Sequence, residues 1–203
     1  LNFAIDACLS GNKYAYLLDT KSKIKQIYNN IPEEYKKKNK YITNINDAGN
    51  PIKYYEGIIE YLNNNSLQLL RMRYINDTWK ADIVRNIGNG NHMPHLIILE
   101  EYDEDNIKSN KPISFSIKGK KYMLDSCIIR DTTKKHFCAT ITCEKDEMAY
   151  DGMSYHRIVP LDWKKNINTE QIWEFEGSND MNNKPLKWNF SDGYQLLFYY
   201  RVN

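Results

Sequence analysis

The sequence lacks the cysteine pairs, long apolar runs and one-sided charge that mark several common protein classes. Its four cysteines include no CxxC pair, so neither a zinc ribbon nor a thioredoxin-type site is encoded, and we expect no metal and no cofactor. No apolar run approaches the roughly 20 residues that span a bilayer, and no signal peptide opens the chain. The net charge of +2 comes from interspersed acidic and basic residues, which predicts no binding to nucleic acid or to a membrane.

What is present indicates an ordinary globular protein. A chain of 203 residues with 41% hydrophobic and 27% charged residues is long enough to bury a sizeable core, and we expect a single domain over residues 1–203. Cys127, Cys138 and Cys143 lie in apolar, strand-like segments, which predicts buried free thiols in a reducing compartment. We therefore expect an intracellular protein, cytoplasmic or nuclear.

The residue pattern changes from helical to strand-like along the chain. Residues 5–30 carry apolar side chains at roughly helical spacing, and the segment from about 54 to 75 predicts one or two further helices. Short apolar runs bounded by polar residues then predict strands at 96–99, 113–117, 122–129, 137–143 and 194–200. Hairpin turns are expected at Lys118–Lys120 and Glu144–Glu147. The sequence predicts an α+β fold, with a helical lobe over 1–92 and an antiparallel sheet over 93–203.

A histidine and an aspartate in the second half carry the clearest chemical signal. Asp151 follows His136 by fifteen residues, and a turn between them would bring the two to neighbouring strands. An aspartate there fixes the histidine tautomer and stabilises the imidazolium that forms when histidine takes a proton. The same pair also fits a simple surface contact. Alternation along the strand puts Phe137, Ala139, Ile141 and Cys143 on a face expected in the core, and His136, Cys138, Thr140 and Thr142 on a more polar face.

Four segments around this pair resemble, in order, the palm of the ubiquitin-specific proteases, a papain-like cysteine protease family. They are Met93–Leu99, Tyr122–Ile129, His136–Asp151 and Gly193–Arg201. The resemblance implies a papain-like fold, in which 1–92 forms a thumb-like lobe with reduced, metal-free fingers and 93–203 a palm-like sheet. It also implies that His136 is the general base and Asp151 its orienting partner.

Three positions depart from the family pattern. Lys135 stands where the family usually has glycine before the histidine, Gly152 replaces a frequent second acidic residue, and Phe137 stands where tyrosine is commoner. The CxxC pairs of the family's finger region are also absent. Ubiquitin itself is therefore not assured as the modifier.

The nucleophile depends on how the first residues are aligned with the family. In one register Cys8 matches the cysteine at the start of the first helix, where the helix dipole and the histidine lower the thiol pKa. In another register Phe3 or Ala4 takes the nucleophile position, and the chain is inactive or its cysteine has been replaced. Cys8 also fits a small buried residue on an amphipathic helix.

An acidic cluster follows the first predicted palm strand. It contains Glu100, Glu101, Asp103, Glu104 and Asp105. The cluster fits either a solvated loop or a substrate-binding contact, because the ubiquitin tail carries arginines.

The expected function is that of a deubiquitinase-like thiol isopeptidase with Cys8, His136 and Asp151 as its catalytic residues and Glu100, Glu101 and Asp103 contacting the substrate. Its expected partner is ubiquitin or a ubiquitin-like protein. The alternative is a catalytically inactive domain of the same fold that binds ubiquitin or a partner protein. A third possibility is an interaction domain unrelated to ubiquitin.

Overall fold

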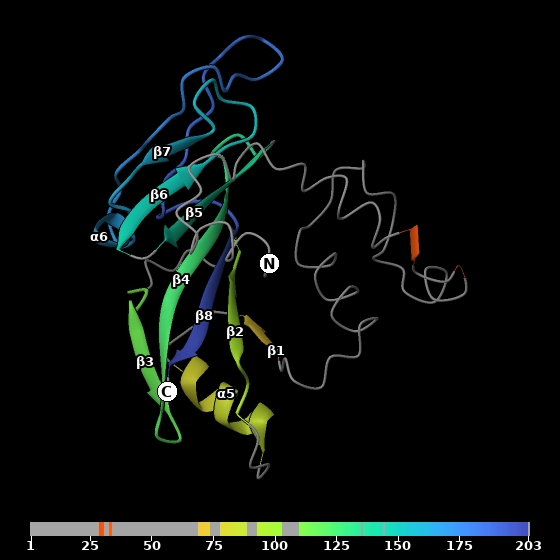
Figure 1. Cartoon of the computed structure of the whole chain (residues 1–203), viewed down its shortest axis with the longest axis vertical. Coiled ribbons are helices and arrows are strands. Elements are labelled where there is room, and N and C mark those ends of the chain that lie inside the picture. Colours follow the sequence, from red (N-terminus) through yellow and green to blue (C-terminus); the bar gives the residue numbers. More distant parts are fainter. Residues whose placement is uncertain are drawn as a thin grey trace. The chain divides into compact units, whose positions relative to one another are not determined.

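The computed structural model describes residues 29–30, 33, 69–73, 78–88, 93–102, 110–134, 136–143 and 145–202 (Figure 1). The chain divides into two compact units, one of residues 1–16 and 69–203 and the other of residues 17–68. Apart from Asn29, Asn30 and Glu33, the described residues belong to the first unit. The predicted helix over 5–30, apart from helical Asn29 and Asn30, lies outside the described residues. None of the helices in the described ranges is long and apolar enough to cross a membrane.

In the described part of this unit, eight strands form one mostly antiparallel sheet. They are β1 (Leu69–Arg73), β2 (Leu96–Glu101), β3 (Ser114–Ile117), β4 (Lys120–Arg130), β5 (Phe137–Cys143), β6 (Asp146–Tyr150), β7 (Ile158–Pro160) and β8 (Gln195–Val202). Their order is β1-β2-β8-β4-β5-β6-β7, with β3 paired to β4. Helices α5 (Trp79–Ile87) and α6 (Trp163–Asn166) lie in the same described part. Figure 1 shows the long strands β4 and β8 side by side near the middle of the sheet. The fold is α+β, as predicted.

The five predicted strands are confirmed, and so is the first hairpin turn. Lys118 and Gly119 connect β3 to β4 with φ angles of 46° and 74°. Two successive residues with positive φ match the right-handed twist of a tight hairpin. The second turn is narrower than predicted, because Asp146 already pairs with Cys143 as the first residue of β6. Glu144 lies outside the described residues.

The prediction of helix over 54–75 is wrong for residues 69–73. Residues Leu69–Arg73 form strand β1, which pairs in parallel with Leu96–Glu100 of β2. A short apolar run has the same composition in a buried strand as in a helix, so periodicity alone does not distinguish them. The pairing with β2, a strand more than twenty residues away, decides the conformation.

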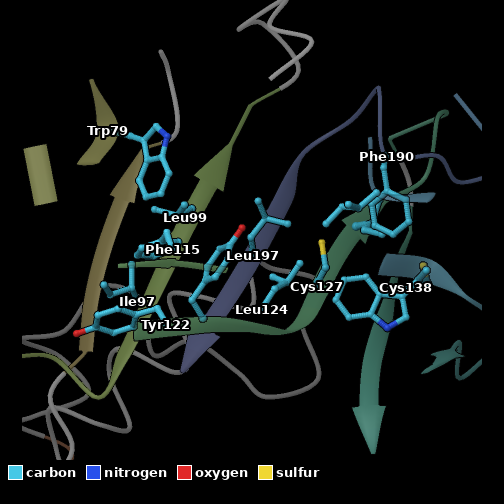
Figure 2. Packing of buried hydrophobic residues seen from close by; sticks show 14 of the residues in the cluster. Trp79, Ile97, Leu99, Phe115, Tyr122, Leu124, Cys127, Cys138, Phe190 and Leu197 are labelled. Carbon is cyan, nitrogen blue, oxygen red and sulfur yellow. The ribbon is translucent and has the colours of Figure 1, made fainter. Parts of the chain in front are cut away.

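The core has one aromatic centre that includes Trp79 of α5 and a second one beside β5. Phe115 contacts Trp79 and Tyr199 at centroid distances of 4.8 Å each and stacks on Tyr122 at 5.4 Å. The second centre contains Trp163, Phe175, Leu186, Trp188 and Phe190, which come from the segment after β7. Figure 2 shows Cys127 between Leu124 and the second centre. A continuous cluster of buried residues thus extends along the sheet.

The faces of β5 are the reverse of the predicted ones. Cys138 and Thr140 are buried, whereas Phe137, Ala139 and Ile141 are only half-buried. Cys138 belongs to the same cluster as Trp163, Trp188 and Phe190 of the second aromatic centre, and Figure 2 shows it near Phe190. Large side chains from later in the chain therefore cover the face that looks more polar in the sequence.

Two of the three cysteines predicted to be free are confirmed. Cys127 and Cys138 are buried free thiols. Cys143 is disulfide-bonded, so the prediction is wrong there. Cys143 is the last residue of β5 and is half-buried.

Gly193, just before β8, allows a close approach of two backbone segments. Its φ is +90°, and a Cβ atom there would lie 2.8 Å from the carbonyl oxygen of Arg130. We expect Gly193→Ala to lower the free energy of unfolding by about 2 kcal/mol and Tm by about 6 °C, as measured by thermal denaturation. Gly88 provides a control with a φ of +61° and no atom within 4 Å of its added Cβ. An equal loss in Gly88→Ala would contradict the steric explanation.

Candidate active site

His136 immediately precedes β5 on a loop closed by a buried carboxylate. Its backbone N–H donates to Oδ1 of Asp131 at 2.6 Å, and the backbone N–H of Asp131 donates to the carbonyl of His136 at 2.8 Å. The other oxygen of Asp131 accepts the backbone N–H of Thr133 at 2.7 Å. These bonds fix the backbone from which the imidazole projects.

Asp151 immediately follows β6 and is brought to His136 by the strand register. Ala139 of β5 pairs with Tyr150 of β6 in the antiparallel hairpin, so the start of β5 and the end of β6 share one edge of the sheet. There Nε2 of His136 lies 2.6 Å from Oδ1 of Asp151. The predicted juxtaposition of these two side chains is confirmed.

The Asp151 carboxylate is fully buried, at 0% exposure, and is surrounded by donors. Oδ1 also accepts the backbone N–H of Met153 at 3.1 Å, and Oδ2 accepts the Ser178 hydroxyl. Burial by itself raises the pKa of Asp151, but hydrogen bonds from His136, Ser178 and Met153 outweigh it and lower the pKa below its ordinary value. The carboxylate is therefore ionised at neutral pH.

The imidazole of His136 is partly accessible while its acidic partner is not. Its side chain is 27% exposed, and the edge of Trp188 packs near it at a centroid distance of 6.2 Å. With Nε2 donating to the ionised Asp151, Nδ1 is the nitrogen left to accept a proton. No described residue hydrogen-bonds to Nδ1. An accessible imidazole oriented by a buried carboxylate is the arrangement of a general base.

The predicted nucleophile, Cys8, and the alternative positions Phe3 and Ala4 lie outside the described residues. Neither described free cysteine is a substitute. Burial raises the pKa of the Cys127 thiol, and burial likewise raises the pKa of Cys138. Because the thiolate is the reactive form, both are inert structural thiols.

Glu100 and Glu101 are buried in strand β2. The interpretation of the acidic cluster as a solvated loop is therefore wrong for these two residues. Their exposed fractions are 2% and 6%. Glu100 accepts the hydroxyls of Tyr194 and, at 2.8 Å, Tyr102, while Glu101 pairs with buried Lys111 at 3.2 Å. The reason is that β2 continues through both residues between β1 and β8. Asp103 lies outside the described residues, and contact of these acids with a substrate stays a prediction.

Sequence reasoning missed two groups that support the pair. Asp131 has a recognisable signal, because an aspartate that binds the backbone N–H two residues later is a common turn. Ser178 has none, since it lies 27 residues from Asp151 in a segment without periodicity. Among the described residues, no group of three or more potential ligands is arranged to hold a metal ion.

Comparison with known proteins identifies no family. No family model matches the sequence, and no curated protein matches it. One solved structure, described as the crystal structure of an essential yeast splicing factor, is similar with 9% sequence identity and a TM-score of 0.35. The match covers 78% of this chain and 33% of that one, so the chain spans about a third of its length. A likeness this weak supports no statement about function.

Proposed function

We propose that the chain is a thiol isopeptidase of the ubiquitin-specific protease type, with a papain-like fold. It cleaves after the C-terminal glycine of ubiquitin or a ubiquitin-like modifier. The observation that carries the proposal is the 2.6 Å contact between accessible His136 and buried, ionised Asp151. This contact joins the two residues that the resemblance marks as general base and orienting partner.

The proposed reaction requires the reduced protein, because Cys143 is disulfide-bonded and a nucleophilic cysteine must be a free thiol. In the reduced protein, Nδ1 of His136 takes the thiol proton of Cys8, and the thiolate attacks the carbonyl carbon of the terminal glycine. Backbone amides near Cys8 stabilise the oxyanion. The intermediate collapses as the leaving lysine amine takes the proton from His136, and a thioester remains on Cys8. His136 then removes a proton from water, which hydrolyses the thioester and releases the glycine carboxylate. Asp151 stabilises the imidazolium at each stage.

Substrate recognition in this proposal involves the acidic residues at the end of β2. Glu100, Glu101 and Asp103 attract the arginines of the modifier's tail. Glu100 is bonded to the hydroxyls of Tyr102 and Tyr194, and Glu101 pairs with Lys111. These buried contacts have to open or share their carboxylates when an arginine binds.

The alternative is an inactive domain of the same fold that binds ubiquitin or a partner protein. The observation that favours it is the second alignment register of the first residues, which places Phe3 or Ala4 rather than Cys8 at the nucleophile position. Such a domain would retain His136 and Asp151 as a structural pair.

The two proposals are separated with a ubiquitin probe bearing a C-terminal electrophile. The protein is first reduced, because Cys143 is disulfide-bonded, and the adduct is detected by mass spectrometry. The proposed enzyme forms one adduct, and Cys8→Ala abolishes it. Ubiquitin binding without an adduct would support the inactive domain. Neither binding nor an adduct, with ubiquitin and with ubiquitin-like probes, would overturn both.

A further inference from the structure

We propose that Ser178 is a positioning residue of the site, whose hydroxyl keeps the Asp151 carboxylate ionised and oriented toward His136. Its effect on catalysis depends on the proposed function, whereas its effect on the carboxylate does not. Ser178 is fully buried, and its Oγ donates to Oδ2 of Asp151.

The two oxygens of the carboxylate have separate donors. Oδ1 receives His136 and the backbone N–H of Met153, at 2.6 and 3.1 Å. Oδ2 receives Ser178. A carboxylate at 0% exposure has lost its hydration, so each donor matters for its charged form. Because Ser178 binds the oxygen that His136 does not, rotation of the carboxylate away from His136 breaks hydrogen bonds at both oxygens.

The backbone holds Ser178 in place from both sides. Its N–H donates to the carbonyl of Phe175 at 3.1 Å, and its carbonyl accepts the N–H of Leu186 at 2.9 Å. The preceding Gly177 has a φ of +87°, which glycine adopts without strain. The hydroxyl is therefore presented from a fixed turn.

This turn is also attached to the loop that carries Asp151. The backbone N–H of Tyr155 donates to the carbonyl of Glu176 at 2.9 Å. The Tyr155 ring lies against Gly177 so closely that a Cβ there would be 2.7 Å from ring atoms. Two contacts besides the hydroxyl thus join the turn to the loop, and Ser178 approaches Asp151 as part of a packed interface.

Loss of the Ser178 hydroxyl should raise the pKa of Asp151. Without the Ser178 hydroxyl, the charged form of Asp151 loses stabilisation relative to its protonated form. The pKa of Asp151 then rises, and the carboxylate is neutralised at a higher pH as the solution is acidified. A protonated Asp151 no longer stabilises the imidazolium of His136, so the acid limb of the activity profile moves to higher pH as well.

The test is a pH titration of the Asp151 carboxyl carbon by NMR, within the range in which the amide spectrum shows a folded protein. We expect a higher midpoint in Ser178→Ala than in the wild type and a wild-type midpoint in Ser178→Thr. Ser178→Cys, with a weaker donor, should fall between them. Ser154→Ala is the matched control, because buried Ser154 donates to the main-chain carbonyl of Asp151, at 2.9 Å, and not to its carboxylate.

An unchanged midpoint in Ser178→Ala, or in Ser178→Cys should the alanine variant not fold, would overturn the role of Ser178. An equal shift in Ser154→Ala would do the same, since it would reveal a general loosening of the loop. For an active enzyme, Ser178→Ala should also move the acid limb of the kcat/KM profile to higher pH by about one unit. A failed proposed function is recognised separately, because the probe adduct is then absent from the wild type whatever the titration shows.

Discussion

His136→Ala is expected to lose activity by about 10⁴-fold or more in kcat/KM on a ubiquitin C-terminal amide. The physical reason is that no other described group can take the proton of the nucleophile at this edge of the sheet. The imidazole is 27% exposed, and its ring lies 6.2 Å from that of Trp188, centroid to centroid, so we expect the fold to survive the change. Hydrolysis is measured with a fluorogenic substrate, and folding by circular dichroism.

His156→Ala is the control for this variant. His156 is an exposed histidine on the loop that follows Asp151, and its carbonyl, which accepts the Ser154 hydroxyl at 2.8 Å, is unaffected by the change. We expect its activity to equal that of the wild type. Retained activity in His136→Ala, or equal losses in the two variants, would contradict the assignment of His136 as the base.

Asp151→Ala is expected to reduce both stability and activity. The change leaves three donors without their acceptor, on His136, Met153 and Ser178. Removing one partner of a buried charged group costs about 3 kcal/mol, which corresponds to a fall in Tm of about 9 °C for a chain of this size. Without the carboxylate, His136 loses its fixed tautomer, and we expect a fall of about 10⁴-fold in kcat.

Asp146→Ala separates this effect from a general loss of negative charge. Asp146 is exposed at the start of β6, in the same hairpin. We expect its Tm and activity to remain near those of the wild type. A Tm of Asp151→Ala within about 1 °C of the wild type would show that the carboxylate is not the buried, fully bonded group described above.

The sequence predicted the strands and the contact of His136 with Asp151 well because local patterns determine both. Phe137–Cys143 was assigned with its observed bounds, and the turn after it made the meeting of His136 and Asp151 predictable. The conformation of Leu69–Arg73 was not predictable in this way, because it depends on pairing with β2.

The buried surroundings of the site were also harder to predict, because they too depend on contacts between segments far apart in the sequence. Thr140 looks polar in sequence, yet residues after β7 complete the core beside it. Glu101 looks like part of a solvated loop until Lys111 is seen beside it. Ser178 carries no local signal, because its role arises only when its turn packs against the Asp151 loop.

The proposed pairing of Cys8 with His136 is tested by the pH dependence of Cys8 alkylation. Reduced protein is treated with iodoacetamide, and modification of the peptide that contains Cys8 is quantified by mass spectrometry, with buried Cys127 and Cys138 as internal references. We predict that Cys8 reacts well below the pH of about 8.5 at which an ordinary thiol ionises, and that His136→Ala abolishes this reactivity at low pH. An ordinary thiol profile for Cys8, identical in the wild type and in His136→Ala, would contradict the claim.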